Sequence, residues 1–331
     1  MIDYKSEIKK LKNKLSVTVV AHFYQIDDVY NLADITGDSL ELAQKCKDDK
    51  SDFIIFCGVE FMGQSVKVIS PNKRVLMPKI ADCSMAKMVN STIFDKNIKL
   101  MESYGISKDN ILAITYINSD VEIKAKVGEM DGFVCTSSNA YKIIEAGLKT
   151  NKKIFFLPDS CLGINIANKM GLKSTILKEG MNRHYLDNID IICFDGFCSV
   201  HQLFTTDNIN FFREKYKDIK IVTHPECSPA VVNKSDFTGS TSEIIKYIKN
   251  LDKNQKIAVG TEFNLVNRLR DKNTYILSST KASCPTMNET TLEDLYNILK
   301  SIEDKKPINE IFVDEKLIKN AQISLNKMLN L

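Results

Sequence analysis

The sequence predicts an α/β fold with three homologous αβα sandwich units, whose parallel sheets are arranged about a pseudo-threefold axis. Two observations predict this fold. One pattern occurs three times along the chain: an apolar strand, a polar residue at its end, and a short polar run that opens a helix. Each copy also ends in one cysteine. Self-similarity at a fixed period indicates repeated units, and strands that alternate with helices indicate parallel sheets.

The cysteines give the repeat its period. Cys83 lies 61 positions after His22, and Cys284 lies 60 positions after His224. The middle copy, which ends at Cys198, is roughly twenty residues longer than the other two. Three such units closing about one axis would bring the three thiols together.

The first unit comprises residues 1–84. A surface helix at 3–14 precedes a strand at 17–23, and Asp38 with Glu41 has the spacing of a capping box at the start of the next helix. The remaining elements of this unit are a strand at 53–57, a helix at 60–69 and a short strand at 74–77.

The second unit comprises residues 85–199, and we assign its additional residues to a surface segment at 173–186. Gly171 ends the helix before that segment, as glycine often does at a helix C-terminus. The other elements are a helix at 84–104 and strands at 111–116, 133–135, 153–157 and 189–194.

The third unit comprises residues 200–284, and the two helices of residues 285–331 are expected to pack back on the first unit. Thr290 and Glu293 have the spacing of a capping box for the first of these helices. The apolar face of the last helix consists of Leu317, Ala321, Leu325 and Met328. The third unit itself has predicted helices at 206–216 and 262–270 and strands at 221–224, 256–259 and 274–277.

Length and composition limit the class of protein. The 331 residues, 44% of them apolar, suffice for two or three compact domains with buried cores. The 45 basic and 42 acidic residues leave a net charge of +3 without a basic run, so we expect no nucleic-acid partner. Residues 1–15 form an amphipathic pattern without the apolar segment of a signal peptide, and no stretch is long enough to span a bilayer. We therefore expect a cytoplasmic protein with no membrane partner.

Nine cysteines are unusual for a reducing compartment, where disulfides are rare. Four lie in apolar or helical contexts and are predicted to be core residues: Cys46, Cys57, Cys135 and Cys193. The sequence leaves the roles of Cys161 and Cys227 open. Cys83, Cys198 and Cys284 each follow a strand and precede a helix, where the helix dipole favours the thiolate that binds metal.

Polar side chains mark the strand ends and the starts of the next helices. The strand ends carry His22, Tyr24, Tyr116, Asn118, His224 and Glu226, and the helix starts carry Ser39, Ser137 and Thr241. Ligands of parallel α/β sheets bind at the carboxyl ends of strands, and helix N-termini attract anions. The pattern predicts a pocket for a small polyanion. Any single residue could instead be a helix cap, as the spacing of Ser240 and Glu243 indicates, or a buried core residue.

Three cysteines far apart in the sequence do not specify one metal. Zinc would need a fourth ligand, which His201 or His224 could supply. A [4Fe-4S] cluster held by only three thiolates would keep one iron open. That iron could act as a Lewis acid in the removal of water from a hydroxyacid-like intermediate.

Over nearly its whole length the sequence resembles the quinolinate synthase family. The similar motifs, in the family's order, are AHFYQIDDVYNLAD, GDSLELA, YINSDVEIKA, CTSSNA, GFCSVH, THPECSPAVV, GSTSEIIKYI, GTEFNLVNRL and CPTMNETTLEDL. HPECSP followed by GSTSEI is highly specific. The sequence has AHFY where AHYY is commoner, and the stretch from Asn118 to Ser137 is longer, which leaves the choice between Ser137 and Ser138 open.

The resemblance implies a [4Fe-4S] cluster held by Cys83, Cys198 and Cys284. It also implies the condensation of iminoaspartate with dihydroxyacetone phosphate to quinolinate, with release of phosphate and two waters, in NAD biosynthesis. The iminoaspartate would come from L-aspartate oxidase or aspartate dehydrogenase.

The resemblance further implies roles for individual residues. Tyr24 and Glu226 would assist proton transfers, and His201 would lie near the phosphate or the cluster. Contacts with the dicarboxylate or its products fall to His22, Ser39, Tyr116, Asn118, Ser137, His224, Glu226 and Thr241. The expected catalytic set is Tyr24, Glu226, His22, Tyr116 and His224.

Two other functions fit the residues less well. One is a hydro-lyase that uses the same cluster on another hydroxyacid. The other is a cluster or zinc protein that senses redox state or binds a partner without catalysis. The polar residues at three strand ends favour a catalytic pocket over the second alternative.

Overall fold

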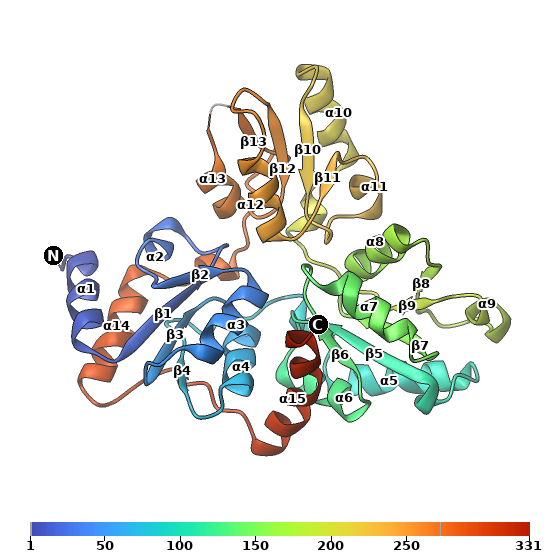
Figure 1. Ribbon diagram of the computed structural model, residues 1–331, viewed down its shortest axis with the longest axis horizontal. Helices are drawn as coiled ribbons and strands as arrows, with labels where there is room; N and C mark the ends of the chain where they lie inside the picture. Colours follow the sequence, from blue (N-terminus) through green and yellow to red (C-terminus); the bar gives the residue numbers. More distant parts are fainter. Residues whose placement is uncertain (1, 272) are drawn as a thin grey trace.

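The computed structural model describes residues 2–271 and 273–331. Figure 1 shows three lobes that meet near the centre of the molecule, each formed by a sheet with helices against it. The lobes follow one another along the chain, from blue through green to yellow and orange. All strand pairs within the three sheets are parallel, which confirms the predicted α/β class.

The first sheet has the strand order β2-β1-β3-β4. Its strands are β1 (Val17–His22), β2 (Ile35–Gly37), β3 (Phe53–Cys57) and β4 (Arg74–Leu76). The helices of this unit are α1 (Tyr4–Lys14), α2 (Asp27–Tyr30), α3 (Ser39–Asp48) and α4 (Glu60–Ile69). The strand β3 is apolar along its whole length because helices cover a parallel sheet on both faces.

The second sheet has five strands in the order β6-β5-β7-β9-β8. They are β5 (Ile111–Tyr116), β6 (Phe133–Cys135), β7 (Lys153–Leu157), β8 (Ser174–Ile176) and β9 (Ile191–Cys193). The helices are α5 (Ser91–Ser103), α6 (Val121–Glu129), α7 (Ala140–Leu148), α8 (Ser160–Met170) and α9 (Arg183–Asp187). The additional residues of this unit thus form an edge strand, β8, and a short helix, α9.

The third sheet has the order β11-β10-β12-β13. Its strands are β10 (Lys220–Thr223), β11 (Phe237–Thr238), β12 (Ile257–Gly260) and β13 (Thr274–Ile276). The helices are α10 (Thr206–Lys215), α11 (Pro229–Val232), α12 (Thr241–Lys249) and α13 (Phe263–Leu269). Apart from the additional edge strand β8, the three sheets therefore share one strand order.

The sheets also share their register. The pair His22 with Gly37 in the first sheet corresponds to Tyr116 with Cys135 in the second. The pair Ala21 with Thr36 in the first sheet corresponds to Thr223 with Thr238 in the third. The residues that follow these pairs therefore leave the three sheets at the same point, their carboxyl edge.

The turns after the three cysteines differ from expectation. The helix expected at 84–104 begins at Ser91, because a short 3-10 helix, η1 (Ala86–Met88), comes first and Asn90 caps α5. Equivalent 3-10 helices, η3 (His201–Leu203) and η4 (Thr286–Asn288), follow the other two cysteines. A fourth, η2 (Lys108–Asn110), precedes β5. Each of the three cysteines therefore precedes a tight turn instead of a long helix.

Two helices follow the third unit, α14 (Leu292–Glu303) and α15 (Glu315–Leu329). The helix α14 contacts α1 and α2, and its capping box joins Thr291 to Asp294, one residue later than predicted. The helix α15 packs mainly on α6 and β6 of the second unit and contacts α4 of the first. The expectation that this last helix packs on the first unit is therefore wrong, because its main partner is the second unit.

A glycine explains why α15 packs on α6. A Cβ atom at Gly128 would lie 1.9 Å from the backbone oxygen of Asn320, so only glycine allows the two helices to approach this closely. The predicted apolar face of α15 then meets the second unit, with Ala321, Leu325 and Met328 buried.

The apolar cores show how the units are joined. One apolar cluster runs through the first and second units and includes residues of α15, whereas the third unit has clusters of its own. The four cysteines predicted to be core residues are buried, and Cys227 is buried as well. The third unit is therefore joined to the others mainly through polar contacts around the site described below.

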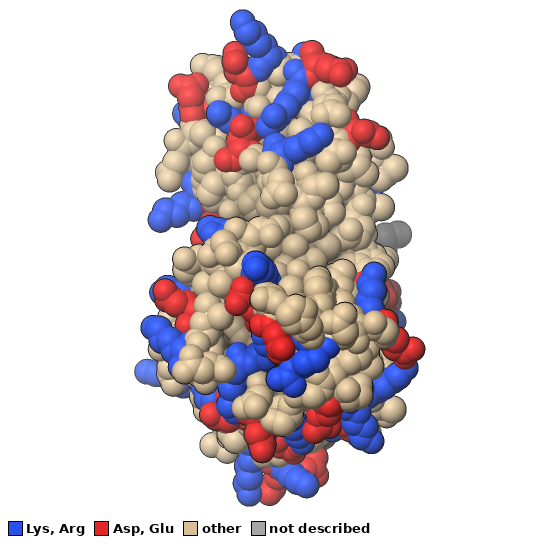
Figure 2. All heavy atoms as spheres, turned by 90° about the vertical axis from the view of Figure 1, so that its right-hand side faces the viewer, with Lys and Arg blue, Asp and Glu red and all other residues tan. Residues whose placement is uncertain are grey.

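Charged side chains of both signs are interspersed on the face shown in Figure 2. The band between the upper and lower parts of that face carries few of them. Among the described residues, no helix combines the length and the apolar character needed to cross a membrane.

Candidate active site

The three units enclose one cavity at the carboxyl edges of their sheets. Each sheet reverses its winding beside the strand that is first in the chain, and this switch point is where ligands of α/β sheets bind. The empty space among its lining residues, counted out into open solvent, measures about 710 Å³. All thirteen residues predicted for the site line it: His22, Tyr24, Ser39, Cys83, Tyr116, Asn118, Ser137, Cys198, His201, His224, Glu226, Thr241 and Cys284.

Two histidines occupy equivalent turns after β1 and β10. The Nδ1 atom of His22 accepts the backbone N–H of Tyr24 at 3.1 Å, and Nδ1 of His224 accepts that of Glu226 at 3.3 Å. Because Nδ1 is an acceptor in both neutral rings, the hydrogen lies on Nε2. The repeat is thus preserved at the level of single atoms, and each ring can donate one hydrogen bond.

Burial keeps both rings neutral. It lowers the pKa of His22 to about 4, although the charge of Asp38 opposes the shift. It lowers the pKa of His224 to about 3 against the opposing charge of Glu226. Neutral imidazoles with a hydrogen on Nε2 are suited to binding carboxylate oxygens without bringing a buried positive charge.

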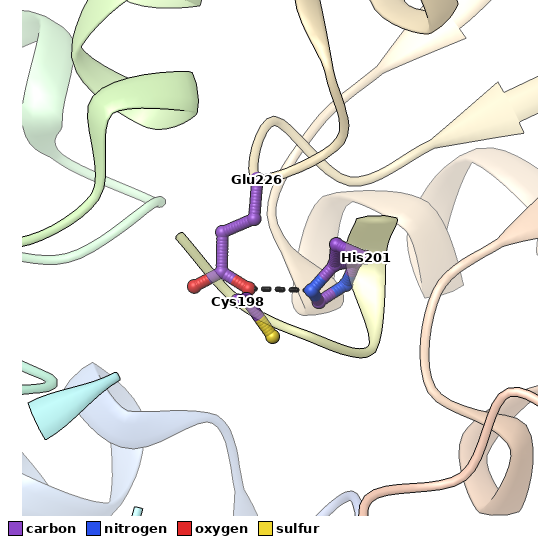
Figure 3. Close-up of side chains that lie close together, drawn as sticks. All are labelled: Cys198, His201 and Glu226. Atoms are coloured by element: carbon purple, nitrogen blue, oxygen red, sulfur yellow. Dashed lines mark ion pairs between the residues drawn. The ribbon is translucent and has the colours of Figure 1, made fainter. Parts of the chain in front are cut away.

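Glu226 and His201 make the closest contact between a carboxylate and a histidine in the cavity, which Figure 3 shows beside Cys198. The Glu226 Oε2 atom lies 2.7 Å from His201 Nδ1 and 3.6 Å from His224 Nδ1. Burial would raise the pKa of the Glu226 carboxyl, but the two histidines and hydrogen bonds from His201 and Tyr116 lower it to about 2. Glu226 is therefore a carboxylate at neutral pH.

The hydroxyl of Tyr24 joins the first unit to the third. It lies 3.0 Å from Thr241 Oγ1 and 2.9 Å from Thr261 Oγ1. Thr261 Oγ1 in turn lies 3.3 Å from Nε2 of His201. Burial and the charge of Glu226 raise the pKa of Tyr24 well above its ordinary value, so the phenol keeps its proton at neutral pH.

The structure separates Ser137 from Ser138. The Ser137 hydroxyl lies 3.3 Å from Nε2 of His224, beside the strand-end residues of the site. The Ser138 hydroxyl donates instead to Oδ2 of Asp38 at 3.2 Å. Ser137 is therefore the member of this pair whose hydroxyl faces the histidine, a choice that the sequence left open.

The three thiols of Cys83, Cys198 and Cys284 line the same cavity. Burial raises the pKa of Cys83 to about 12 and also raises those of Cys198 and Cys284, against backbone N–H groups that bond to the sulfurs. In the chain without a metal, burial outweighs these N–H groups, which by themselves favour the thiolate. A metal centre would have to displace these protons on binding.

The cavity also offers a smaller set of possible metal ligands. One ligand atom each from Cys198, His201 and Glu226 lies within 4.8 Å of the others. This set shares Cys198 with the three thiols, so the two sets describe one region of the cavity. The three thiols fit a cluster with three cysteine ligands, because all face one enclosed space and receive backbone N–H groups.

Three residues of the site were not identified from the sequence: Asp38, Thr261 and Glu262. Asp38 and Glu262 line the cavity, and Thr261 links Tyr24 to His201. Burial raises the pKa of Glu262 to about 7, although its carboxylate accepts the backbone N–H of Cys284 at 3.2 Å. The signal for the last two was the GTE that ends β12, a polar strand end like the others.

Comparisons with known proteins agree with the geometry of the site. The sequence matches the family NadA, described as Quinolinate synthetase A protein, over residues 6–330. It is 51% identical to Quinolinate synthase of Helicobacter pylori (strain ATCC 700392 / 26695), over 99% of this chain and 98% of that protein. It is 41% identical to Quinolinate synthase of Bacillus pumilus (strain SAFR-032), over 94% of this chain and 88% of that protein. It is 38% identical to that of Bacillus subtilis (strain 168), over 99% and 93%. The chain therefore belongs to the NadA family of quinolinate synthetases.

Proposed function

We propose that the chain catalyses the reaction of a quinolinate synthase in NAD biosynthesis. Iminoaspartate and dihydroxyacetone phosphate condense to quinolinate, and phosphate and two waters are released. The observation that carries this proposal is the cavity between the three units, which all thirteen predicted site residues line. Its polar groups come from all three units and suit a small ligand with two carboxylates.

The dicarboxylate is held by neutral hydrogen-bond donors. His22 and His224 each present an Nε2 hydrogen, as the bonds to their Nδ1 atoms require. The starts of α3, α7 and α12 contribute Ser39, Ser137 and Thr241. Hydroxyls and backbone N–H groups at helix starts stabilise negative charge, so the two carboxylates can be bound without a buried lysine or arginine.

Proton transfers fall to Glu226 and Tyr24. Glu226 is ionised at neutral pH and can accept a proton, whereas Tyr24 is protonated and can donate one. Tyr116 contacts the Glu226 carboxylate and holds it in place. Glu226 and Tyr116 are buried and Tyr24 is half-buried, so a reactive imine bound among them is partly shielded from water.

A [4Fe-4S] cluster is the cofactor that we propose, with Cys83, Cys198 and Cys284 as its ligands. Three thiols that face one cavity fit such a cluster, and its fourth iron would supply a Lewis acid for the dehydration steps. His201 lies beside Cys198 and is held by Glu226, so it is placed to contact the phosphate or the cluster edge.

The division of the chain is also a proposal. The units are residues 1–84, 85–199 and 200–284, and the shared strand order supports a pseudo-threefold axis through the cavity. Residues 285–331 return to the first two units. The free state of all nine cysteines suits a cytoplasmic location.

The substrate itself limits the partners. Iminoaspartate is the oxidised form of aspartate, so an enzyme that oxidises the aspartate amine, either L-aspartate oxidase or aspartate dehydrogenase, must supply it. Dihydroxyacetone phosphate is the second substrate.

The first experiment measures iron and acid-labile sulfide in anaerobically purified protein. Wild-type chain is expected to hold about four of each, and Cys83→Ser is expected to lose them while the chain stays folded. Cys161→Ser is the matched control, because Cys161 is half-buried near the site but does not line the cavity. Zinc, or no metal, in wild-type protein would overturn the cluster.

The second measurement is the product. Quinolinate should form only when iminoaspartate and dihydroxyacetone phosphate are both supplied. Turnover without the triose phosphate would favour a hydro-lyase that acts on another hydroxyacid. A stable cluster without turnover on either substrate would favour a redox sensor.

A further inference from the structure

The carboxylate of Asp38 joins all three units at one point. Its Oδ1 atom accepts the backbone N–H groups of Leu40 and Glu41 at 3.1 and 3.0 Å, which caps α3 in the first unit. Its Oδ2 atom accepts the hydroxyl of Ser138 in the second unit at 3.2 Å and that of Ser242 in the third at 2.7 Å. Asp38 is buried, with 7% of its surface exposed.

Ser138 lines the cavity together with Ser137, and Ser242 is the neighbour of Thr241, which also lines it. Ser138 follows Ser137 at the turn before α7, and Ser242 follows Thr241 at the start of α12. Thr241 and Ser242 are successive residues of α12, and successive side chains of a helix point about 100° apart, whereas Ser137 and Ser138 are successive residues of the turn before α7. When Asp38 holds Ser138 and Ser242, the side chains of Ser137 and Thr241 therefore point in directions other than toward Asp38.

We propose that Asp38 is a positioning residue for the dicarboxylate. By binding Ser138 and Ser242 it fixes the helix starts of the second and third units against that of the first, so that Ser39, Ser137 and Thr241 converge on one ligand. The proposal rests on the proposed function, because it concerns the same pocket. Asp38 is not among the predicted ligand contacts. Its proposed role is to bring together the residues that make those contacts.

Two other roles for Asp38 predict different results. If Asp38 serves only as the N-cap of α3, any good capping residue can replace it without effect on the ligand. If its charge dominates, it repels the dicarboxylate, and every neutral replacement should tighten binding. Positioning predicts the opposite sign, a loss of binding when the side chain no longer reaches the two serines.

The experiment measures quinolinate binding by calorimetry to the anaerobically purified holoenzyme. Asp38→Ser keeps a capping hydroxyl but is too short to reach Ser138 and Ser242, and we expect it to raise Kd by at least about tenfold. Asp38→Asn keeps the length of the side chain and should bind within about threefold of wild type, because its amide can still meet both hydroxyls. Unchanged or tighter binding by Asp38→Ser would overturn the proposal.

The partners of Asp38 provide the second test. The double variant Ser138→Ala with Ser242→Ala should reproduce the loss seen in Asp38→Ser, and the triple variant should lose no more, because the three side chains act as one unit. Additive losses would show that the serines act separately from Asp38. Asp314→Ser is the matched control: Asp314 caps α15 through the N–H of Lys316 at 2.8 Å and lies outside the cavity.

Failure of the proposed function has a separate signature. If wild-type protein neither forms nor binds quinolinate, the proposed function is wrong. The hydrogen bonds of Asp38 with Ser138 and Ser242 are then tested by thermal unfolding of the same variants. The melting temperatures should still show non-additive effects of Asp38→Ser and the two serine changes. Additive effects on the melting temperature would contradict the proposal that Asp38, Ser138 and Ser242 act as one unit.

Discussion

The Nδ1 atom of His201 lies 2.7 Å from the Oε2 atom of Glu226, and both side chains are at least 95% buried. A carboxylate this deep in the protein would normally be destabilised, yet the histidines keep the pKa of Glu226 at about 2. Glu226 therefore combines negative charge with enclosure.

Replacing Glu226 by Gln should reduce kcat by about 10²- to 10⁴-fold, because the amide cannot accept the proton. The iron content should stay at the wild-type value, since the three cysteines are the proposed ligands. Steady-state rates and iron analysis on the same preparation test both statements. Wild-type turnover in Glu226→Gln would exclude the carboxylate as the base.

Replacing Tyr24 by Phe should lower kcat by about 10²-fold, with little change in the affinity for quinolinate. The change removes the hydroxyl that contacts Thr241 and Thr261 but keeps the ring against His22. Tyr247→Phe serves as the control, because Tyr247 stacks on Phe237 outside the cavity. An equal loss in both variants would mean that Tyr24 has only a structural role.

Arg268 of α13 holds the turn that carries Tyr24. Its guanidinium donates to the backbone oxygens of Phe23 and Gln25 and lies 2.8 Å from Asp27 Oδ1. Arg268→Ala should reduce kcat/KM by about tenfold, because a misplaced catalytic group is costly even when the change lies outside the chemistry. Arg268→Lys should not restore activity, since lysine lacks the planar arrangement of donors.

The control for this prediction is Arg213→Ala. Arg213 also bonds a backbone oxygen, that of Lys234 at 2.7 Å, but its contacts stay within the third unit. Its replacement should leave kcat/KM unchanged. If both variants lose activity equally, the contact between the first and third units is not what matters.

Gly128→Ala should destabilise the chain by about 2 kcal/mol or more, because the added methyl group meets the backbone of α15 and neither helix can yield locally. Gly63→Ala in α4 is the control, since its Cβ would meet the flexible side chain of Met77. Both changes gain the same helix propensity, so the difference between their urea midpoints reports the clash. Equal midpoints would show that α15 can shift.

Stability should fall as the pH drops from about 6.5 to 4.5. Unfolded histidines take up protons in this range, while the pKa values of buried His22 and His224 are lowered to about 4 and about 3. Each ring contributes at most about 1.4 kcal/mol per pH unit. Glu226 stays ionised in both states above its ordinary pKa of about 4.5, so its contribution is lost only below that value.

Urea unfolding at several pH values tests this prediction. The double variant His22→Gln with His224→Gln should show a smaller loss of stability between pH 6.5 and 4.5. A slope equal to that of the wild type would assign the effect to other groups.

The repeats made much of the fold predictable. Apolar strands with polar ends, such as the one that delivers His224, carry a signal in every copy, so the parallel sheets and the edge that carries the site followed from them. The turns after the cysteines did not follow, because the bonds that shorten the helix before Ser91 are local and the apolar pattern continues across them.

The partner of α15 was not predictable for a different reason. Its apolar face indicates that the helix packs against another part of the protein but does not indicate which part. The decisive feature is the absence of a side chain at Gly128, which lies far from α15 in the sequence. For a related reason, the sequence did not identify Thr261 as a site residue and indicated only a helix cap for Asp38. A threonine, or an aspartate at the start of a helix, usually has a structural role. Only the folded chain shows that each of these two residues also connects different units.

The position of α15 has a consequence for the order of synthesis. Asn320 bonds to Glu129 of α6, which precedes it by 191 positions. A ribosome that adds about 5–20 residues per second therefore leaves the apolar face of α6 and β6 uncovered for roughly 10–40 seconds after it emerges. The second unit, although its strands are complete early, reaches its final burial only when α15 has emerged, and until then this apolar face is open to aggregation and to chaperones.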